Sequence, residues 1–203
     1  MSSPISRGFR RLRRPSAGEQ GRVPPGQYVT QDFPVLSAGP TPHTALPEWT
    51  FSIRQGGDTL KSWTWPEFQA LSAQTVTVDI HCVTRWSKLD TTWRGIPVDT
   101  LLAQAGRDAP YVLAFCDGGY TTNLPVQDVT MGQAWVAFDY DGQPLGSEHG
   151  GPARLLVPHL YFWKSAKWVR GLEPLDHDEP GFWETYGYHI YGEPWKEQRY
   201  AGD

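Results

Sequence analysis

The chain has 203 residues, 39% hydrophobic and 13% aromatic, which suffice for a substantial core in one domain. Its net charge is −4, and no apolar run reaches the length of a membrane span. Two cysteines, Cys82 and Cys116, provide neither a disulfide framework nor a paired-cysteine zinc site. This cysteine usage favours a reducing compartment, so we expect a cytoplasmic protein.

The first 25 residues form a basic segment. Six arginines and one glutamate lie within the first 22 residues, so an arginine-rich arm precedes an acidic body. The arginine pairs resemble a twin-arginine export signal, but a segment rich in Pro and Gly follows them where such a signal needs an apolar stretch. We expect residues 1–25 to be a flexible arm. Nucleic acid is not an expected partner, although the arm leaves polyanion binding open.

Residues 26–44 are too irregular for a helix, but aromatic and aliphatic residues within them predict an ordered, wrapped loop. Alternation over 49–54 predicts a strand that turns at two glycines, 56 and 57. Thr64 with Glu67 three residues later is a capping box, and predicts a short helix that continues to Leu71.

The next elements are strands and one further helix. Residues 76–82 alternate apolar and polar, which predicts a half-buried strand that ends at Cys82. A helix is expected over 98–105, with Gly106 as its terminator. Further strands are expected over 111–115, 134–140, 153–157 and 168–172, with a turn-rich loop over 116–125.

Because strands outnumber short helices, the predicted fold class is α+β rather than doubly wound α/β. The predicted domain covers residues 26–175. The remaining segment, 176–203, contains Trp and Tyr but few aliphatic residues, and predicts an aromatic C-terminal extension packed on the domain or used in a subunit contact.

Cys82 is the first candidate functional residue. A thiol at the end of a strand can face a crevice between loops, where a guanidinium such as that of Arg85 would lower its pKa and favour a metal-binding thiolate. A buried, purely structural cysteine is the alternative. A cysteine hydrolase with His149 or His159 as its base is a second alternative, although the chain has no expected nucleophile turn and helix.

Two cationic segments form a second candidate site. His149 to Arg154 and Lys164 to Lys167 offer an arginine fork, lysine charges, a hydroxyl and glycine backbone, which together could bind a phosphate. A solvated lysine pair on an exposed loop is the alternative.

Five motifs occur in an order that resembles the molybdopterin-binding domain of the sulfite oxidase family, over most of residues 28–172. The chain looks most similar to compact bacterial members that resemble the methionine sulfoxide reductase catalytic subunit. The motifs are Cys82-Val-x-x-Trp-Ser87, Trp93-x-Gly-Ile-Pro97, Asp117-Gly-x-Tyr120 with Leu124-Pro125, Gly150-x-Pro-x-Arg154 with Val157-Pro158, and Lys164-Ser-x-Lys167-Trp168.

The resemblance implies a mixed-sheet fold, a molybdenum–molybdopterin cofactor and Cys82 as the protein's ligand to molybdenum. It implies a cofactor-binding set that consists of Gln31, Phe33, Cys82, Asp117, His149, Arg154, Ser165 and Lys167. Arg85 and Tyr120 are the candidates for orienting the substrate. Thr84 and His149 depart from the reductases, which have Glu and Asn at these positions, so the substrate cannot be transferred from them.

The expected function is two-electron oxygen-atom transfer on a small sulfite-, sulfoxide- or N-oxide-like substrate. A separate haem or flavin protein would exchange the electrons, because the chain shows no haem-binding domain. A non-catalytic protein that binds molybdopterin or a partner through the same fold is the alternative.

Overall fold

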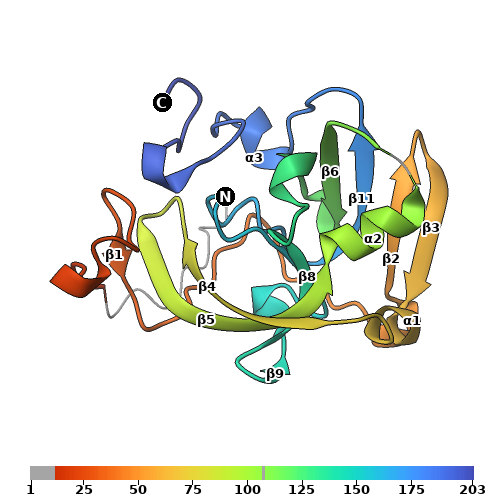
Figure 1. Ribbon diagram of the computed structural model, residues 1–203, viewed down its shortest axis with the longest axis horizontal. Coiled ribbons are helices and arrows are strands. Elements are labelled where there is room, and N and C mark those ends of the chain that lie inside the picture. The colour runs from red at the N-terminus through yellow and green to blue at the C-terminus, as the bar shows by residue number, and fades with distance from the viewer. Residues whose placement is uncertain (1–11, 107) are drawn as a thin grey trace.

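A computed structural model describes residues 12–106 and 108–203. They form two mixed β-sheets and three short helices (Figure 1). The first sheet contains β1 (Tyr28–Val29), β4 (Gln74–His81), β5 (Trp86–Pro97), β8 (Trp135–Tyr140), β9 (Gln143–Pro144) and β10 (Arg154–Leu156). The second contains β2 (Thr50–Gln55), β3 (Asp58–Thr64), β6 (Tyr111–Cys116), β7 (Thr121–Pro125) and β11 (Val169–Leu175).

Strand order explains why both sheets are mixed. The first sheet runs β1-β5-β8-β10, with β4 paired to β5 and β9 to β8, and the second runs β3-β2-β11-β6-β7. Only β1 with β5 and β2 with β11 pair in parallel, while the other ladders are antiparallel. The predicted α+β class with a mixed sheet is confirmed.

The two longer helices begin and end where local chemistry predicts. Helix α1 (Trp65–Gln69) starts at the capping box, in which Glu67 Oε2 accepts from the Thr64 backbone N–H at 2.8 Å, and it stops two residues before the expected end. Helix α2 (Val98–Ala105) ends at Gly106, whose φ of 66° is left-handed. A glycine without a Cβ adopts this conformation at little cost. Helix α3 (Phe182–Thr185) lies in the C-terminal extension.

Five strands were missing from the expectation, and two of them, β1 and β9, have only two residues each. The segment 116–125, expected as a turn-rich loop, contains only one 3-10 turn before β7 pairs with β6. Strands β3 and β5 carry many polar or exposed residues, so they lack a clear apolar alternation, and their pairing with β2, β4 and β8 defines them. Gly95 of β5 has a local reason to be glycine, because a Cβ there would lie 2.6 Å from the Val136 carbonyl oxygen.

Two apolar clusters form the core. The larger packs residues of β2, β6, β8 and β11 against α1 and α2, with Trp49, Phe51 and Phe68 fully buried. The smaller contains Cys82 and the aromatic residues around it, including Trp86 and Trp93. The candidate ligand thus lies in its own aromatic cluster at the end of β4.

The terminal segments lie on this body. Residues 1–11 of the expected arm are outside the described residues. Within 12–25, Arg13 pairs with Glu19, and the Arg22 guanidinium pairs with the carboxylates of Asp79 and Asp90, each at 2.6 Å. The two Arg22 pairs join this part of the basic arm to the acidic body.

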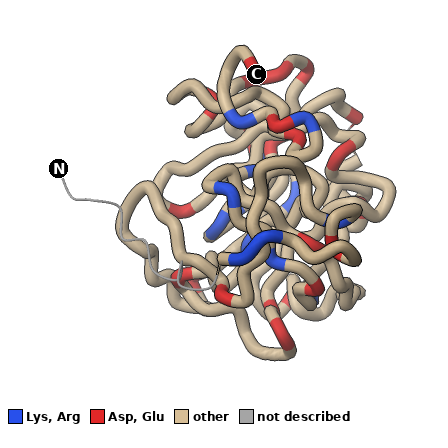
Figure 2. Tube along the Cα trace, turned by 90° about the vertical axis from the view of Figure 1, so that its left-hand side faces the viewer, with Lys and Arg blue, Asp and Glu red and all other residues tan. Residues whose placement is uncertain are grey.

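The C-terminal extension, 176–203, returns along the domain and carries acidic residues near the chain end (Figure 2). Among the residues that the structure describes, no helix has the length and apolar character required to cross a membrane.

Candidate functional site

A cavity of about 630 Å³ opens beside Cys82. Residues from six stretches line it, within 33–42, 82–86, 117–120, 148–154, 162–168 and 182–188. The first stretch belongs to the wrapped loop and the last to the C-terminal extension. The cavity therefore brings together segments that are far apart in the sequence, and both candidate sites from the sequence face the same space.

Cys82 follows β4 directly and starts a tight turn. Its N–H donates to the Trp86 carbonyl at 2.8 Å, and the Arg85 N–H donates to the Cys82 carbonyl at 2.9 Å. This turn places the Thr84 hydroxyl 3.2 Å from Sγ, where it donates to the sulfur. Burial raises the pKa of the Cys82 thiol, while the bonds from Thr84 and Val83 and the charge of Arg154 act to lower it.

The structure does not bring Arg85 to the cavity. Arg85 has a φ of 72° on the turn, and its side chain is exposed and absent from the cavity lining. The guanidinium that acts on Cys82 is that of Arg154, 72 positions later in the chain. The sequence predicted the correct kind of neighbour, but proximity along the chain identified the wrong arginine.

Phe33 and His149 form one wall of the cavity. Their rings stack with centroids 3.9 Å apart and planes 10° from parallel. Burial, together with the charges of Arg154 and Lys167, lowers the pKa of His149 to about 4, so its ring is neutral at pH 7. Gln31 does not join them, because its side chain is exposed and does not line the cavity, while its main-chain carbonyl accepts from Lys88 Nζ at 2.7 Å.

Arg154 is the central cation of the site and is only 2% exposed. It donates to the main-chain carbonyls of His149 at 2.8 Å and Ser165 at 2.5 Å. Its guanidinium also lies over the Phe162 ring, 4.0 Å from the centroid. Burial lowers the pKa of Arg154 to about 9. Within the described part of the chain, no ion pair involves this side chain.

Lys167 lies on the same side of the cavity. Its Nζ donates to the Leu36 carbonyl at 2.7 Å and to the Glu148 carbonyl at 3.2 Å. Burial and the nearby Arg154 lower the pKa of Lys167 to about 7. Ser165 Oγ accepts from the Val157 N–H at 2.8 Å. Arg154 and Lys167 lie close together, and their described hydrogen bonds all go to neutral groups. Together they can therefore bind an anion.

Asp117 and Tyr120 line the cavity, but each is already bonded within the protein. The Asp117 carboxylate accepts from Thr44 at 2.6 Å and pairs with Arg170 at 3.3 Å. The Tyr120 hydroxyl donates to the Trp163 carbonyl at 2.7 Å. Burial raises the pKa of Tyr120 well above its usual value. Both side chains are therefore fixed in position, and neither offers a free charge to the cavity.

Within the described part of the chain, neither histidine of the hydrolase alternative is hydrogen-bonded to Cys82. His159 Nε2 lies 3.1 Å from Asp128 Oδ1, and the residue does not line the cavity. His149 is stacked on Phe33. His81, next to Cys82, is buried with Nδ1 2.8 Å from Ser87 Oγ. The geometry therefore gives no support to a Cys–His nucleophile.

Several cavity residues were not expected from the sequence. Trp86 stands in the first motif, and its buried indole N–H has no hydrogen-bond partner among the described residues. Trp163, Trp183 and Tyr188 add an aromatic side to the cavity. Trp86 could have been proposed as a site residue from the sequence, because a buried tryptophan usually donates its indole N–H to a hydrogen-bond acceptor. The C-terminal residues have no local signal for a site.

These residues fit a metal-bound anionic cofactor. A soft thiol in Cys82 suits a thiophilic metal, an unpartnered N–H in Trp86 can donate to a ligand, and Arg154 with Lys167 can neutralise a phosphate. The fold and the site together define a domain suited to bind an anionic, metal-containing cofactor.

Comparison with known proteins agrees with that class. Residues 38–183 match the family described as oxidoreductase molybdopterin binding domain, so the chain belongs to this family of molybdopterin-dependent oxidoreductases. The chain is 41% identical to the uncharacterized oxidoreductase YuiH of Bacillus subtilis, over 91% of its own length and 95% of that protein.

Other relatives are longer than this chain. A putative protein-methionine-sulfoxide reductase subunit, YedZ1 of Azospira oryzae, is 31% identical over 64% of this chain and 50% of its own length. The sulfane dehydrogenase SoxCD of Paracoccus pantotrophus has a similar fold, with a TM-score of 0.59 and 23% identity over 68% of this chain and 40% of that chain. The chain therefore spans about half or less of these two proteins.

Proposed function

We propose that the protein catalyses two-electron oxygen-atom transfer on a small sulfite-, sulfoxide- or N-oxide-like substrate. The observation that carries this proposal is the shared cavity, in which the Cys82 thiol and the cations Arg154 and Lys167 face the same space. Cys82 would bind molybdenum, and the cations would bind the phosphate end of the pterin. When bound, the cofactor supplies the two-electron chemistry.

The chain's own residues have three tasks in this proposal. Cys82 holds the metal, and the Thr84 hydroxyl, which donates to Sγ, reduces the electron density on the sulfur. Phe33 and His149 present a flat, neutral surface on which a pterin ring can stack. The aromatic side of the cavity excludes water from the reacting atoms.

Electrons would be exchanged with a separate haem or flavin protein. Support comes from the names of relatives such as YedZ1, which is called a subunit. Location in the cytoplasm remains a prediction from cysteine usage, and cell fractionation would test it.

The test compares Cys82→Ser with Cys116→Ser, because both thiols are buried but only Cys82 lines the cavity. Each protein is produced in a host that makes the cofactor, and molybdenum, released pterin and turnover with an artificial electron donor are measured. We expect one molybdenum per wild-type and Cys116→Ser chain. Cys82→Ser should lose at least 1,000-fold in activity, about 4 kcal/mol in barrier height. Full molybdenum and activity in Cys82→Ser would contradict the proposal, and metal without turnover in wild type would favour the non-catalytic alternative.

A further inference from the structure

The C-terminal extension contributes Phe182, Trp183 and Tyr188 to the lining of the cavity. Trp183 and Tyr188 stack with centroids 5.0 Å apart and planes 18° from parallel. Tyr188 meets Trp163 edge-on, also at 5.0 Å. All three line the cavity and belong to the same apolar cluster as Cys82. We call Trp163, Trp183 and Tyr188 the aromatic wall.

The aromatic wall differs in charge from the rest of the cavity. The charged residues that line it are Asp117, Glu148, Arg154 and Lys167, and none of them comes from the extension. Aromatic faces bind apolar or positively polarised groups and offer nothing to an inorganic anion. A ligand that touches the aromatic wall would therefore present an organic substituent to it.

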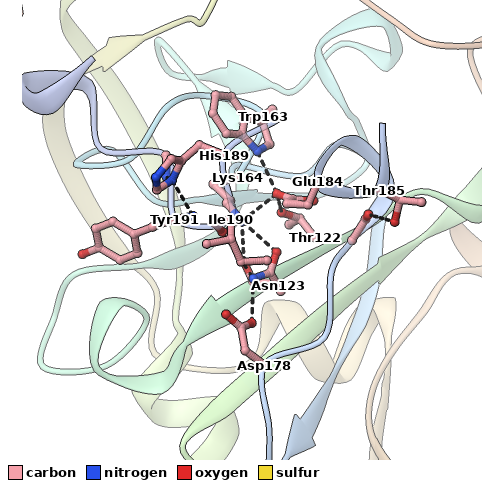
Figure 3. Close-up of polar contacts among 12 residues, drawn as sticks. Thr122, Asn123, Trp163, Lys164, Asp178, Glu184, Thr185, His189, Ile190 and Tyr191 are labelled. Carbon is pink, nitrogen blue, oxygen red and sulfur yellow. Dashed lines mark hydrogen bonds and ion pairs between the residues drawn. The ribbon is translucent and has the colours of Figure 1, made fainter. Parts of the chain in front are cut away.

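A buried ion pair fastens this wall to the domain (Figure 3). Lys164 Nζ lies 2.6 Å from Glu184 Oε1, and both side chains are only 1% exposed. Glu184 Oε1 also accepts from Trp163 Nε1 at 2.8 Å. Glu184 lies between Trp183 and Tyr188 in the chain, so one carboxylate joins the extension directly to Trp163.

Lys164 completes the same network. Its Nζ donates to the Asn123 carbonyl at 2.9 Å, the Asn123 side-chain oxygen at 2.8 Å and the Ile190 carbonyl at 2.7 Å. Asn123 in turn donates to Asp178 at 2.7 Å. Lys164 thus joins β7 to the extension at two places. It does not line the cavity, unlike Lys167 three residues later.

Glycines fix both ends of the wall segment 181–192. A Cβ at Gly181 would lie 2.6 Å from Thr122 Cα, and one at Gly192 would lie 2.7 Å from the Trp163 ring. The chain therefore packs on β7 at one end and on Trp163 at the other with no space for a side chain. The segment is therefore tightly packed against the domain at both ends.

We propose that Trp183 and Tyr188 determine which organic substituent the substrate carries, and that Lys164 and Glu184 are positioning residues that hold this wall. The inference rests on the proposed function and specifies the substrate side of the same site. Only residues 38–183 match the family, so Tyr188 and the end of the wall segment lie beyond the match.

The first experiment compares Trp183→Ala with Trp195→Ala. Both tryptophans lie in the extension, but Trp195 is 47% exposed and does not line the cavity. The molybdenum-loaded proteins are assayed with dimethyl sulfoxide and methyl p-tolyl sulfoxide, and the dissociation constants of both are measured by calorimetry. We expect Trp183→Ala to lower the preference for methyl p-tolyl sulfoxide over dimethyl sulfoxide at least tenfold in kcat/KM and in affinity, because it removes an aromatic face that would contact the tolyl ring. Trp195→Ala should change it less than twofold.

These readouts separate the role of the aromatic wall in substrate choice from the proposed oxygen-atom transfer. If both tryptophan variants show the same substrate preference and wild type is active, the aromatic wall does not determine the substrate, while the proposed function stands. A shifted ratio of dissociation constants in proteins that turn over neither sulfoxide would support the wall and overturn sulfoxide turnover as the function.

The second experiment tests positioning with Glu184→Gln and the double variant Lys164→Met with Glu184→Met. Hydrogen exchange of residues 181–192 is measured together with molybdenum content and KM. We expect Glu184→Gln to increase exchange in this segment at least tenfold and to raise KM, with molybdenum content and kcat within twofold. The double variant, which leaves no unpaired buried charge, should recover most of the protection. Unchanged exchange and KM in Glu184→Gln would contradict the positioning role.

Discussion

The aromatic and cationic sides of the cavity differ in how the charge of a nearby lysine is balanced. On the aromatic side, Lys164 is paired with the carboxylate of Glu184 at 2.6 Å, away from solvent. On the cationic side, Lys167 bonds only main-chain carbonyls and lies close enough to Arg154 for repulsion to lower its pKa. Lys164 is balanced by a carboxylate of the protein, whereas no described ion pair balances Lys167, which is left to lose its proton or to pair with a bound anion. The first lysine is part of a protein ion pair, and the second is available to a ligand.

The largest expected effect is at the paired lysine. Lys164→Met leaves the buried Glu184 carboxylate without its cation, and breaking such a pair costs about 3–5 kcal/mol. Urea unfolding should show this loss, and the double variant with Glu184→Met should restore most of it. A single variant as stable as wild type would show that Lys164 is not needed to balance Glu184.

A second prediction concerns the tight packing of the aromatic side. Gly192 and Gly187 both have positive φ, 82° and 94°, but a Cβ at Gly187 would meet nothing within 4 Å. Alanine at either position is strained, while only Gly192→Ala also collides with the Trp163 ring. We expect Gly192→Ala to lose about 2 kcal/mol more in unfolding free energy than Gly187→Ala. Equal losses would mean that the Trp163 ring moves aside freely.

A third prediction uses the pH dependence of the cationic side. The pKa of Lys167 is about 7 in the folded chain and about 10.4 in an unfolded one. Between these values the unfolded state binds more protons, so the unfolding free energy of the cofactor-free protein should rise with pH. This group should add about 2 kcal/mol from pH 7 to pH 9.

Lys167→Met is the control for that measurement, because it lacks the titrating amine. Urea unfolding of both proteins at pH 7 and pH 9 isolates the contribution of Lys167. If both gain the same stability, the lysine is not desolvated as the structure indicates.

The smallest expected effect is on cofactor affinity. Lys167→Met removes one of two cations at the proposed phosphate seat, and we expect about tenfold weaker retention of pterin, about 1.4 kcal/mol. The cofactor-free protein should be as stable as wild type or more so at pH 7, in contrast to Lys164→Met. Pterin retention after dialysis measures the first effect. Undiminished retention would place the phosphate elsewhere.

Much of the fold was predictable because its signals are local. The capping box of Thr64 and Glu67, the helix from Val98 and its glycine stop depend on neighbours within a few residues. The α+β class and the molybdopterin family followed from strand patterns and ordered motifs, and both are confirmed. Strands β3, β5 and β7 were missed because partner strands, rather than their own alternation, satisfy their backbones.

Local patterns were enough to predict the residue types at the site: a thiol at a strand end, an arginine and a lysine in glycine-rich surroundings, and a family that uses them. Which arginine and which lysine face the cavity depends on how the chain folds in three dimensions. The tertiary structure placed Arg154 instead of Arg85 near Cys82, and it separated Lys164 from Lys167. It also brought the C-terminal extension to the cavity. The physical reason is that side-chain direction in irregular turns, and charge pairing between distant segments, depend on packing that no local pattern encodes.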